Sequence, residues 1–87
     1  MDSSSTTTDL LTHRVMEIAA EQVGADLSQV NSATRFVEDL GFDSLDVAEF
    51  TLEIEDEYEV GIPDEQVDRL KTVQAVVDWI QAQQHAA

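Results

Sequence analysis

The chain has 87 residues, which suits a single domain with a modest core. Its 19 acidic and 4 basic residues give a formal net charge of −15, which excludes nucleic-acid binding, repels anionic membrane surfaces and attracts basic protein patches. It has no cysteine, so it forms no disulfide and no metal–thiolate site and suits a reducing compartment. No apolar run approaches the ~18 residues of a membrane-spanning helix and no signal segment opens the chain, so we expect a cytoplasmic protein.

The N-terminal part of the sequence predicts a disordered tail followed by a helix. Residues 1–8 are mostly Ser and Thr and are too polar to pack, so we expect them to be disordered. From about Asp9 to Val23 apolar residues recur at helical spacing, and Gly24 stands where a helix-ending glycine belongs. His13 lies on this helix among charged neighbours, as a solvated side chain typically does, and we assign it no role.

A long loop is predicted between residues 24 and 42, because this stretch is rich in Asp, Ser, Asn and Thr and has weak periodicity. A loop of this length should be pinned by its own apolar side chains, and a short helical turn is expected near Ser28–Val30. The expected anchors are Leu27, Val30, Phe36, Val37 and Leu40. The loop would deliver Asp43 and Ser44 to an exposed corner of the molecule.

The second helix, from about Ser44 to Tyr58, is the most informative predicted element. Gly41 breaks the preceding structure, Asp43 is a favourable N-cap, and Asp46 suits the first helical turn. Ser44 therefore falls at the cap or first position of a helix, where unpaired N–H groups and the positive end of the peptide dipoles accommodate a phosphate. Its hydroxyl is a suitable attachment point for a phosphodiester.

The residues alone leave other interpretations of Ser44 open. It could serve only as a second N-cap. It could be a hydrolase nucleophile, but the Gly-x-Ser-x-Gly elbow is missing and the only available bases are His13 and His85. A calcium loop fails, because the nearby acidic residues lack the spacing, central glycine and terminal Glu of an EF-hand. We expect no catalytic residue and no metal site.

Two faces of the second helix differ in character. One carries an ordinary core stripe of Val47, Phe50, Thr51, Ile54 and Tyr58. The opposite face carries Leu45, Ala48 and Leu52, flanked by Asp46, Glu49, Glu53, Glu55 and Asp56. Such a face can be simply a solvated acidic surface. It also fits a docking surface, on which charge steers a basic partner and the leucines supply contact area.

Two further helices are predicted in the last third of the chain. Ile62–Glu65 begins a short helix with Pro63 at an early position, after which Val67 and Leu70 would point inward. Thr72 then caps a last helix that runs through about Gln83. Its apolar stripe consists of Val73, Val76, Val77 and Ile80, with Trp79 at the edge.

The predicted fold is an all-α four-helix bundle with three long helices, one short helix and a long first loop. The folded domain should span residues 9–84, between the disordered tail of residues 1–8 and a frayed C-terminus of residues 85–87. Its core would draw on Val15, Ile18, Phe36, Val47, Phe50, Ile54, Ile62, Val67, Leu70, Val76, Val77 and Ile80.

The sequence around Ser44 resembles the attachment motif of acyl carrier proteins. The run Asp39-Leu40-Gly41-Phe42-Asp43-Ser44-Leu45-Asp46, with Glu49 following, carries the resemblance. It covers about Leu10 to Gln83, since similar segments occur in the same order at residues 36–40, 62–65 and 72–75. In the stand-alone, fatty-acid-synthesis type of this family, the serine bears a 4′-phosphopantetheine arm whose thiol holds acyl intermediates as thioesters. The resemblance implies that residues 9–84 are an acyl carrier domain and not an enzyme.

The resemblance also implies roles for individual residues. Ser44 would receive 4′-phosphopantetheine from coenzyme A through a phosphopantetheinyl transferase. The residues that partner enzymes recognise would be Asp43, Leu45, Asp46, Glu49, Leu52, Glu55 and Asp56. An expandable acyl pocket would be lined by Phe36, Ile54, Ile62, Val67, Leu70, Val76 and Trp79.

The expected partners are the transferase and basic-patched enzymes of acyl transfer and fatty-acid synthesis, with no nucleic acid, no membrane and a monomeric state. Phe42, Ala48 and Thr51 depart from the family pattern and leave the pathway open among fatty-acid synthesis, a polyketide-type system and a specialised route. The acidic second helix favours a stand-alone fatty-acid type over a peptidyl carrier. The alternative function is an unmodified acidic helical adaptor that docks basic partner proteins.

Overall fold

The computed structural model describes residues 3–85, with side chains described from Thr8 to Gln84. Its elements in chain order are α1 (Ser3–Val23), the 3₁₀ helix η1 (Leu27–Gln29), α2 (Ser44–Tyr58), α3 (Asp64–Val67) and α4 (Val73–His85). Within this range no strand forms, and extended backbone pairs only in an isolated bridge between Arg35 and Thr72. The prediction of an all-α bundle with three long helices and one short helix is confirmed.

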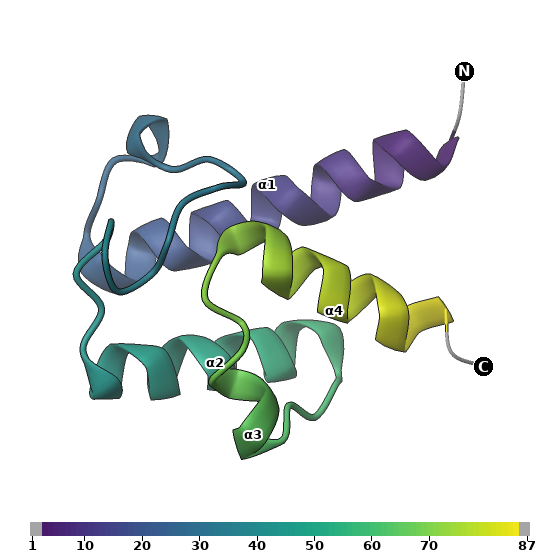
Figure 1. Cartoon of the computed structure of the whole chain (residues 1–87). Coiled ribbons are helices and arrows are strands. Elements are labelled where there is room, and N and C mark those ends of the chain that lie inside the picture. Colours follow the sequence, from purple (N-terminus) through teal and green to yellow (C-terminus); the bar gives the residue numbers. More distant parts are fainter. Residues whose placement is uncertain (1–2, 86–87) are drawn as a thin grey trace.

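Helix α1 is the element against which the other long helices pack, since it contacts both α2 and α4. Figure 1 shows α2 and α4 running back toward the end of the bundle at which α1 begins. The loop between α1 and α2 folds over the other end, where α2 starts, and the short α3 connects α2 to α4 (Figure 1). The start of α2 is therefore a corner of the molecule that faces away from both chain ends.

Helix α1 begins at Ser3, whereas the sequence predicted a start near Asp9 after a disordered tail. Once a helix is nucleated, each further residue adds a hydrogen bond at little extra cost, so a Ser/Thr stretch can extend it. A contact with α4 reaches this part of the helix, since the Gln81 side-chain amide donates to the Thr8 hydroxyl at 2.6 Å. The first two residues of the expected tail lie outside the described residues.

The C-terminal end of α1 has the predicted glycine geometry. Gly24 has a φ of +67°, a conformation that costs a residue with a Cβ more than it costs glycine. The Ala25 N–H donates to the Ala20 carbonyl at 2.9 Å and the Gly24 N–H to the Glu21 carbonyl at 3.4 Å, which together form a Schellman motif. The chain turns sharply there and enters the loop.

The loop is pinned by its own apolar side chains, as expected, but not by all of those predicted. The 3₁₀ helix lies where a helical turn was expected, and Val30 and Phe36 are buried. Val37 was wrongly predicted as an anchor, since 57% of it is exposed. The Phe36 N–H donates to the Lys71 carbonyl at 3.0 Å, which fixes the Phe36 ring inward and sends the next side chain outward. Phe42, which was not predicted in the core, is only 4% exposed.

The core is a single cluster of apolar side chains drawn from α1, the loop, α2 and α4. Most of the predicted members are buried, while Val47, Val67 and Leu70 are half-buried at its edge. Trp79 also packs against the cluster without being fully enclosed. The buried apolar residues are Leu11, Val15, Ile18, Ala19, Ala20, Val30, Phe36, Phe42, Phe50, Ile54, Ile62, Val73, Val76, Val77 and Ile80.

The last two helices begin as predicted. Pro63 immediately precedes α3, whose first turn carries Asp64 and Glu65. Thr72 caps α4, because its hydroxyl oxygen accepts from the Ala75 N–H at 3.1 Å. Helix α4 continues to His85, slightly beyond the predicted end near Gln83, and the final two residues of the expected frayed C-terminus lie outside the described residues.

Candidate functional site

Ser44 is the first residue of α2, and the chain before it is shaped to present it. Gly41 has a φ of +71° and its N–H donates to the Val37 carbonyl at 3.1 Å, which closes the loop just before the helix. Asp43 is the N-cap. Ser44 is exposed, and its hydroxyl makes no hydrogen bond with any other residue among those described. A serine hydroxyl that is exposed and uncommitted at a helix N-terminus is accessible for covalent modification.

A capping box fixes the first turn of α2. The Asp43 carboxylate accepts from the Asp46 N–H at 2.8 Å, and the Asp46 carboxylate accepts from the Asp43 N–H at 3.1 Å. Both bonds are made by charged acceptors to backbone donors that the helix would otherwise leave unpaired. The two carboxylates that flank Ser44 in the sequence are therefore held in place by the cap. The prediction that Asp43 is the N-cap of this helix is confirmed.

A side chain of α1 also braces the start of α2. The Gln22 amide nitrogen donates to the Asp46 carboxylate at 3.2 Å and to the Glu49 carboxylate at 2.8 Å. The pKa of Asp46 is lowered, chiefly because the Asp43 N–H donates to its carboxylate and next because the Gln22 amide does. The sequence predicted no role for Gln22, so this bridge was missed.

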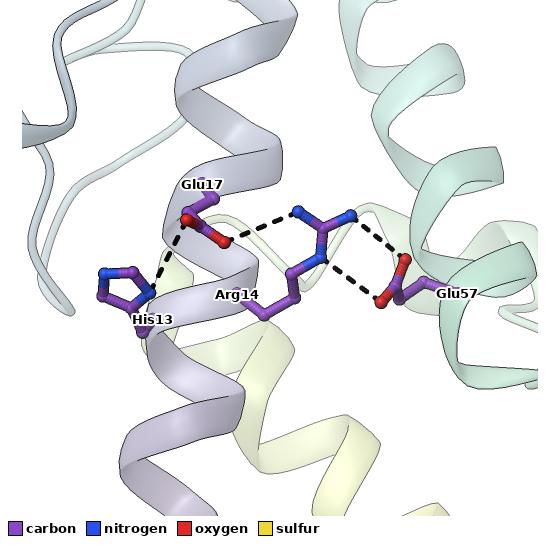
Figure 2. Close-up of polar contacts among 4 residues, drawn as sticks. All are labelled: His13, Arg14, Glu17 and Glu57. Atoms are coloured by element: carbon purple, nitrogen blue, oxygen red, sulfur yellow. Dashed lines mark hydrogen bonds and ion pairs between the residues drawn. The ribbon is translucent and has the colours of Figure 1, made fainter.

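The opposite end of α2 is tied to α1 by an ion pair (Figure 2). The Arg14 guanidinium donates to both carboxylate oxygens of Glu57, at 3.2 and 3.3 Å, and to the Glu17 carboxylate at 3.5 Å. Its hydrogen bond with Glu57 raises the pKa of Arg14 above its ordinary value. His13 lies beside Glu17, with its Nδ1 3.8 Å from the carboxylate. The Arg14–Glu57 pair therefore links α1 to the C-terminal part of α2, as Gln22 links it to the N-terminal part.

The residues predicted for partner docking all lie on α2 or at its cap, but they are not equivalent. Leu45 and Leu52 are each 64% exposed, which is unusual for large apolar side chains. Asp43, Glu49 and Asp56 are exposed as well. Asp46 and Glu55 are half-buried, and the carboxylates of Asp43, Asp46, Glu49 and Glu55 all accept hydrogen bonds within the chain. The Glu55 carboxylate accepts from the Ile62 N–H at 2.6 Å, which ties the linker before α3 back to α2.

A surface groove runs from Ser44 along α2 toward α3. Its α2 wall continues through Val47, Ala48 and Thr51, and its α3 wall includes Val67. The groove shares Val47, Thr51, Ile62, Val67 and Asp68 with a deeper, largely apolar pocket of about 260 Å³ between α2 and α3. Ser44 therefore lies on the wall of a groove that borders the same residues as the apolar pocket.

The pocket includes six of the seven residues predicted for an acyl pocket, namely Phe36, Ile54, Ile62, Val67, Leu70 and Val76. Trp79 does not line it and packs elsewhere against the core. The rings of Phe42 and Phe50 also line the pocket. Neither was predicted there, since Phe50 was expected only in the core stripe of the second helix and Phe42 was not assigned to the core. Helical periodicity separates inside from outside but gives no information about where the interior is hollow.

Some alternative sites can be examined directly. Among residues 3–85, no cluster of three or more His, Cys, Asp or Glu side chains is arranged to hold a metal ion. No helix in this part of the chain is both long and apolar enough to cross a membrane. The described contacts of His13 go to Glu17 on its own helix, so nothing assigns it as a base for Ser44.

The chain matches the phosphopantetheine attachment site family over residues 13–80, and it belongs to that family. The match extends from within α1 to within α4 and includes the whole of α2. Domains of this family are carriers that hold covalently attached 4′-phosphopantetheine, and they interact with phosphopantetheinyl transferases and acyl-handling enzymes. An exposed serine at a helix N-terminus fits such a group, because the helix end accommodates the phosphodiester and the adjoining groove can receive what the arm carries.

Proposed function

We propose that Ser44 is the attachment site and that the chain tethers acyl intermediates as thioesters, passing them between enzymes of fatty acid biosynthesis. The observation that carries this proposal is the position of the Ser44 hydroxyl, exposed at the N-terminus of α2 and at the mouth of a groove leading to an apolar pocket. The family match supports the carrier role. The serine and the pathway are our inference.

Loading would proceed by transfer from coenzyme A. The Ser44 hydroxyl gives up its proton and its oxygen bonds to the phosphorus that bears pantetheine, while the pyrophosphate bond breaks and adenosine 3′,5′-bisphosphate leaves. Unpaired N–H groups of the first turn of α2 partly offset the charge of the resulting phosphodiester. The capping box keeps these N–H groups in place. The attached group then supplies the thiol, which this chain lacks because it has no cysteine.

The apolar pocket would shelter the acyl chain. An engineered apolar cavity of about 150 Å³ admits benzene, so a pocket of about 260 Å³ accommodates a short alkyl chain without rearrangement. Thr51 places a hydroxyl on this wall, but the hydroxyl donates to the Val47 carbonyl at 2.7 Å, so its proton is not available to a carbonyl group of a bound chain. The apolar side chains of this wall favour a saturated fatty chain, while the charged residues Glu38, Asp68 and Lys71 also border the pocket.

The exposed face of α2 would be the docking surface. Leu45 and Leu52 offer apolar contact area, and Asp43, Glu49 and Asp56 surround them with negative charge. A carrier must leave each enzyme after delivery, and charge at the rim of an interface speeds encounter more than it tightens binding. We therefore expect basic partners and short-lived complexes.

Mass spectrometry tests the attachment site. Purified protein is incubated with coenzyme A and a broad-specificity phosphopantetheinyl transferase, and its intact mass should rise by one phosphopantetheine. Ser44→Ala should gain nothing while keeping the helical circular dichroism spectrum. Ser28→Ala is the matched control, because Ser28 is also exposed near a helix start and follows the N-cap Asp26. Loading of Ser44→Ala, or no loading of the folded unmodified wild-type chain, would exclude the proposal.

A further inference from the structure

Three phenylalanine rings form part of the pocket wall away from the Ser44 groove. The residues that the groove and the pocket share lie between them. The rings of Phe36, Phe42 and Phe50 line the pocket but not the groove. An alkyl chain that passes from the groove into the pocket therefore meets these rings only inside the pocket.

The rings pack on one another as a compact cluster. The centroids of Phe36 and Phe50 are 4.8 Å apart, those of Phe36 and Phe42 are 5.3 Å apart, and those of Phe42 and Phe50 are 5.6 Å apart. These separations lie within the range of favourable aromatic pairs. Each residue is only 4% exposed. The cluster is thus a packed wall and not a set of loosely held side chains.

Phe42 is the outer member of this cluster and is fixed from its backbone. It makes the two longer ring contacts, so its removal would leave the Phe36–Phe50 pair intact. Its N–H donates to the Phe36 carbonyl at 3.0 Å, and the Phe36 N–H donates to the Lys71 carbonyl at 3.0 Å. The backbone of Phe42 is therefore held by hydrogen bonds of the loop, and its ring is held by packing against Phe36 and Phe50.

The opposite wall is less firmly held. Val67 ends α3, a helix of four residues, and is only half-buried. A helix this short has little stability of its own and depends on its contacts. An acyl chain that enters the pocket can displace the α3 wall more easily than the wall formed by the rings. The pocket therefore widens at α3, while the rings set its depth.

We propose that Phe42 determines the length of acyl chain that the protein shelters, by forming the fixed floor of the pocket. This inference rests on the proposed attachment of acyl intermediates at Ser44. Chains that stop short of the ring are covered completely. Longer chains cannot pass it, so the carbons nearest the thioester remain in water or the chain forces the α3 wall outward. Replacing Phe42 with a smaller apolar residue should deepen the pocket toward Phe36 and Phe50.

Acyl chains of graded length, from four to sixteen carbons, are the probe. They are loaded onto wild type, Phe42→Leu and Phe42→Ala from the corresponding acyl-coenzyme A compounds, and loading is verified by intact mass. The melting temperature of each acyl form is compared with that of the same variant carrying the free thiol. Ile80→Ala is the control, because Ile80 is fully buried in the core and does not line the pocket. Phe42→Leu keeps the series informative if Phe42→Ala does not fold.

In wild type the stabilisation by the acyl chain should rise with length and then reach a maximum, since each sheltered methylene adds buried apolar surface. In the Phe42 variants the maximum should move to chains longer by roughly two to four carbons, because truncation of a core ring leaves space. Ile80→Ala should lower every melting temperature and leave the maximum in place. An unshifted maximum in the Phe42 variants, an equal shift in Ile80→Ala, or a wild-type profile without dependence on length overturns the inference. These failures differ from failure of the proposed function, in which Ser44 takes up no arm at all.

Discussion

The N-cap of α2 allows the structural and the electrostatic roles of Asp43 to be separated. Asp43→Ala removes the acceptor of the 2.8 Å bond from the Asp46 N–H and also removes a negative charge at the positive end of the helix. Loss of an Asp N-cap costs about 1 kcal/mol, within a range of about 0.5–2 kcal/mol. Relief of self-repulsion in a chain of net charge −15 offsets a small part of this. For a domain of this size, 1 kcal/mol corresponds to about 4–8 °C in melting temperature.

Asp43→Asn is the matched variant, because asparagine caps a helix about as well as aspartate but carries no charge. Thermal unfolding followed by circular dichroism should show a loss of about 4–8 °C for Asp43→Ala and less than half of that for Asp43→Asn. Both variants should be loaded more slowly by the phosphopantetheinyl transferase, because both remove charge from the proposed docking face. Equal thermal losses in the two variants, or no loss in Asp43→Ala, would refute the assignment of the cap as the main role of Asp43 in folding.

Three further predictions concern the charge of the protein. Added sodium or magnesium chloride should raise the melting temperature, because salt screens the repulsion among 15 uncompensated negative charges, and a flat response would contradict this. The pKa of Asp46 is lowered from 3.8, so its contribution to stability is present above that pH and is lost as the pH falls through the lower value of the folded state. Urea unfolding of Asp46→Asn should therefore depend less steeply on pH below about 4 than that of wild type, and identical slopes would count against the argument. Arg14→Gln should reduce the free energy of unfolding by less than about 1 kcal/mol, as is usual for exposed ion pairs. This loss should become smaller at high salt, which screens the pair. A loss that salt does not change would mean that Arg14 acts through packing.

The helices and their ends could be predicted because their causes lie close together in the sequence. Gly24 ends α1 through its own backbone conformation, and Thr72 caps α4 through a bond to a residue three positions later. Asp43 and Asp46 form their capping box within a single turn. The position of Ser44 at the start of α2 follows from these local interactions alone. The family resemblance carried by the same segment agrees with the family match over residues 13–80.

The side chains that only the tertiary structure revealed are those whose partners are distant in sequence. Gln22 reaches Asp46 and Glu49 from another helix, and nothing in its local pattern distinguishes it from a core-edge residue. Glu55 was assigned to the docking face, yet its carboxylate also holds the Ile62 N–H. Such bonds depend on how α1, α2 and the α3 linker approach one another, which periodicity does not specify.

The hollow of the molecule likewise belongs to the tertiary structure. Periodicity identifies Phe36, Ile54 and Val76 as inward-facing, but it cannot distinguish a side chain that fills the core from one that borders a cavity. Trp79 faces inward without reaching the pocket, and Phe42, from an irregular segment with no period, forms part of its wall. Local sequence was enough to predict where α2 and α4 begin and which serine stands at the start of α2. The packing of α2, α3 and the loop decided that this serine adjoins an apolar pocket, because a cavity exists only where surfaces from separate elements meet imperfectly.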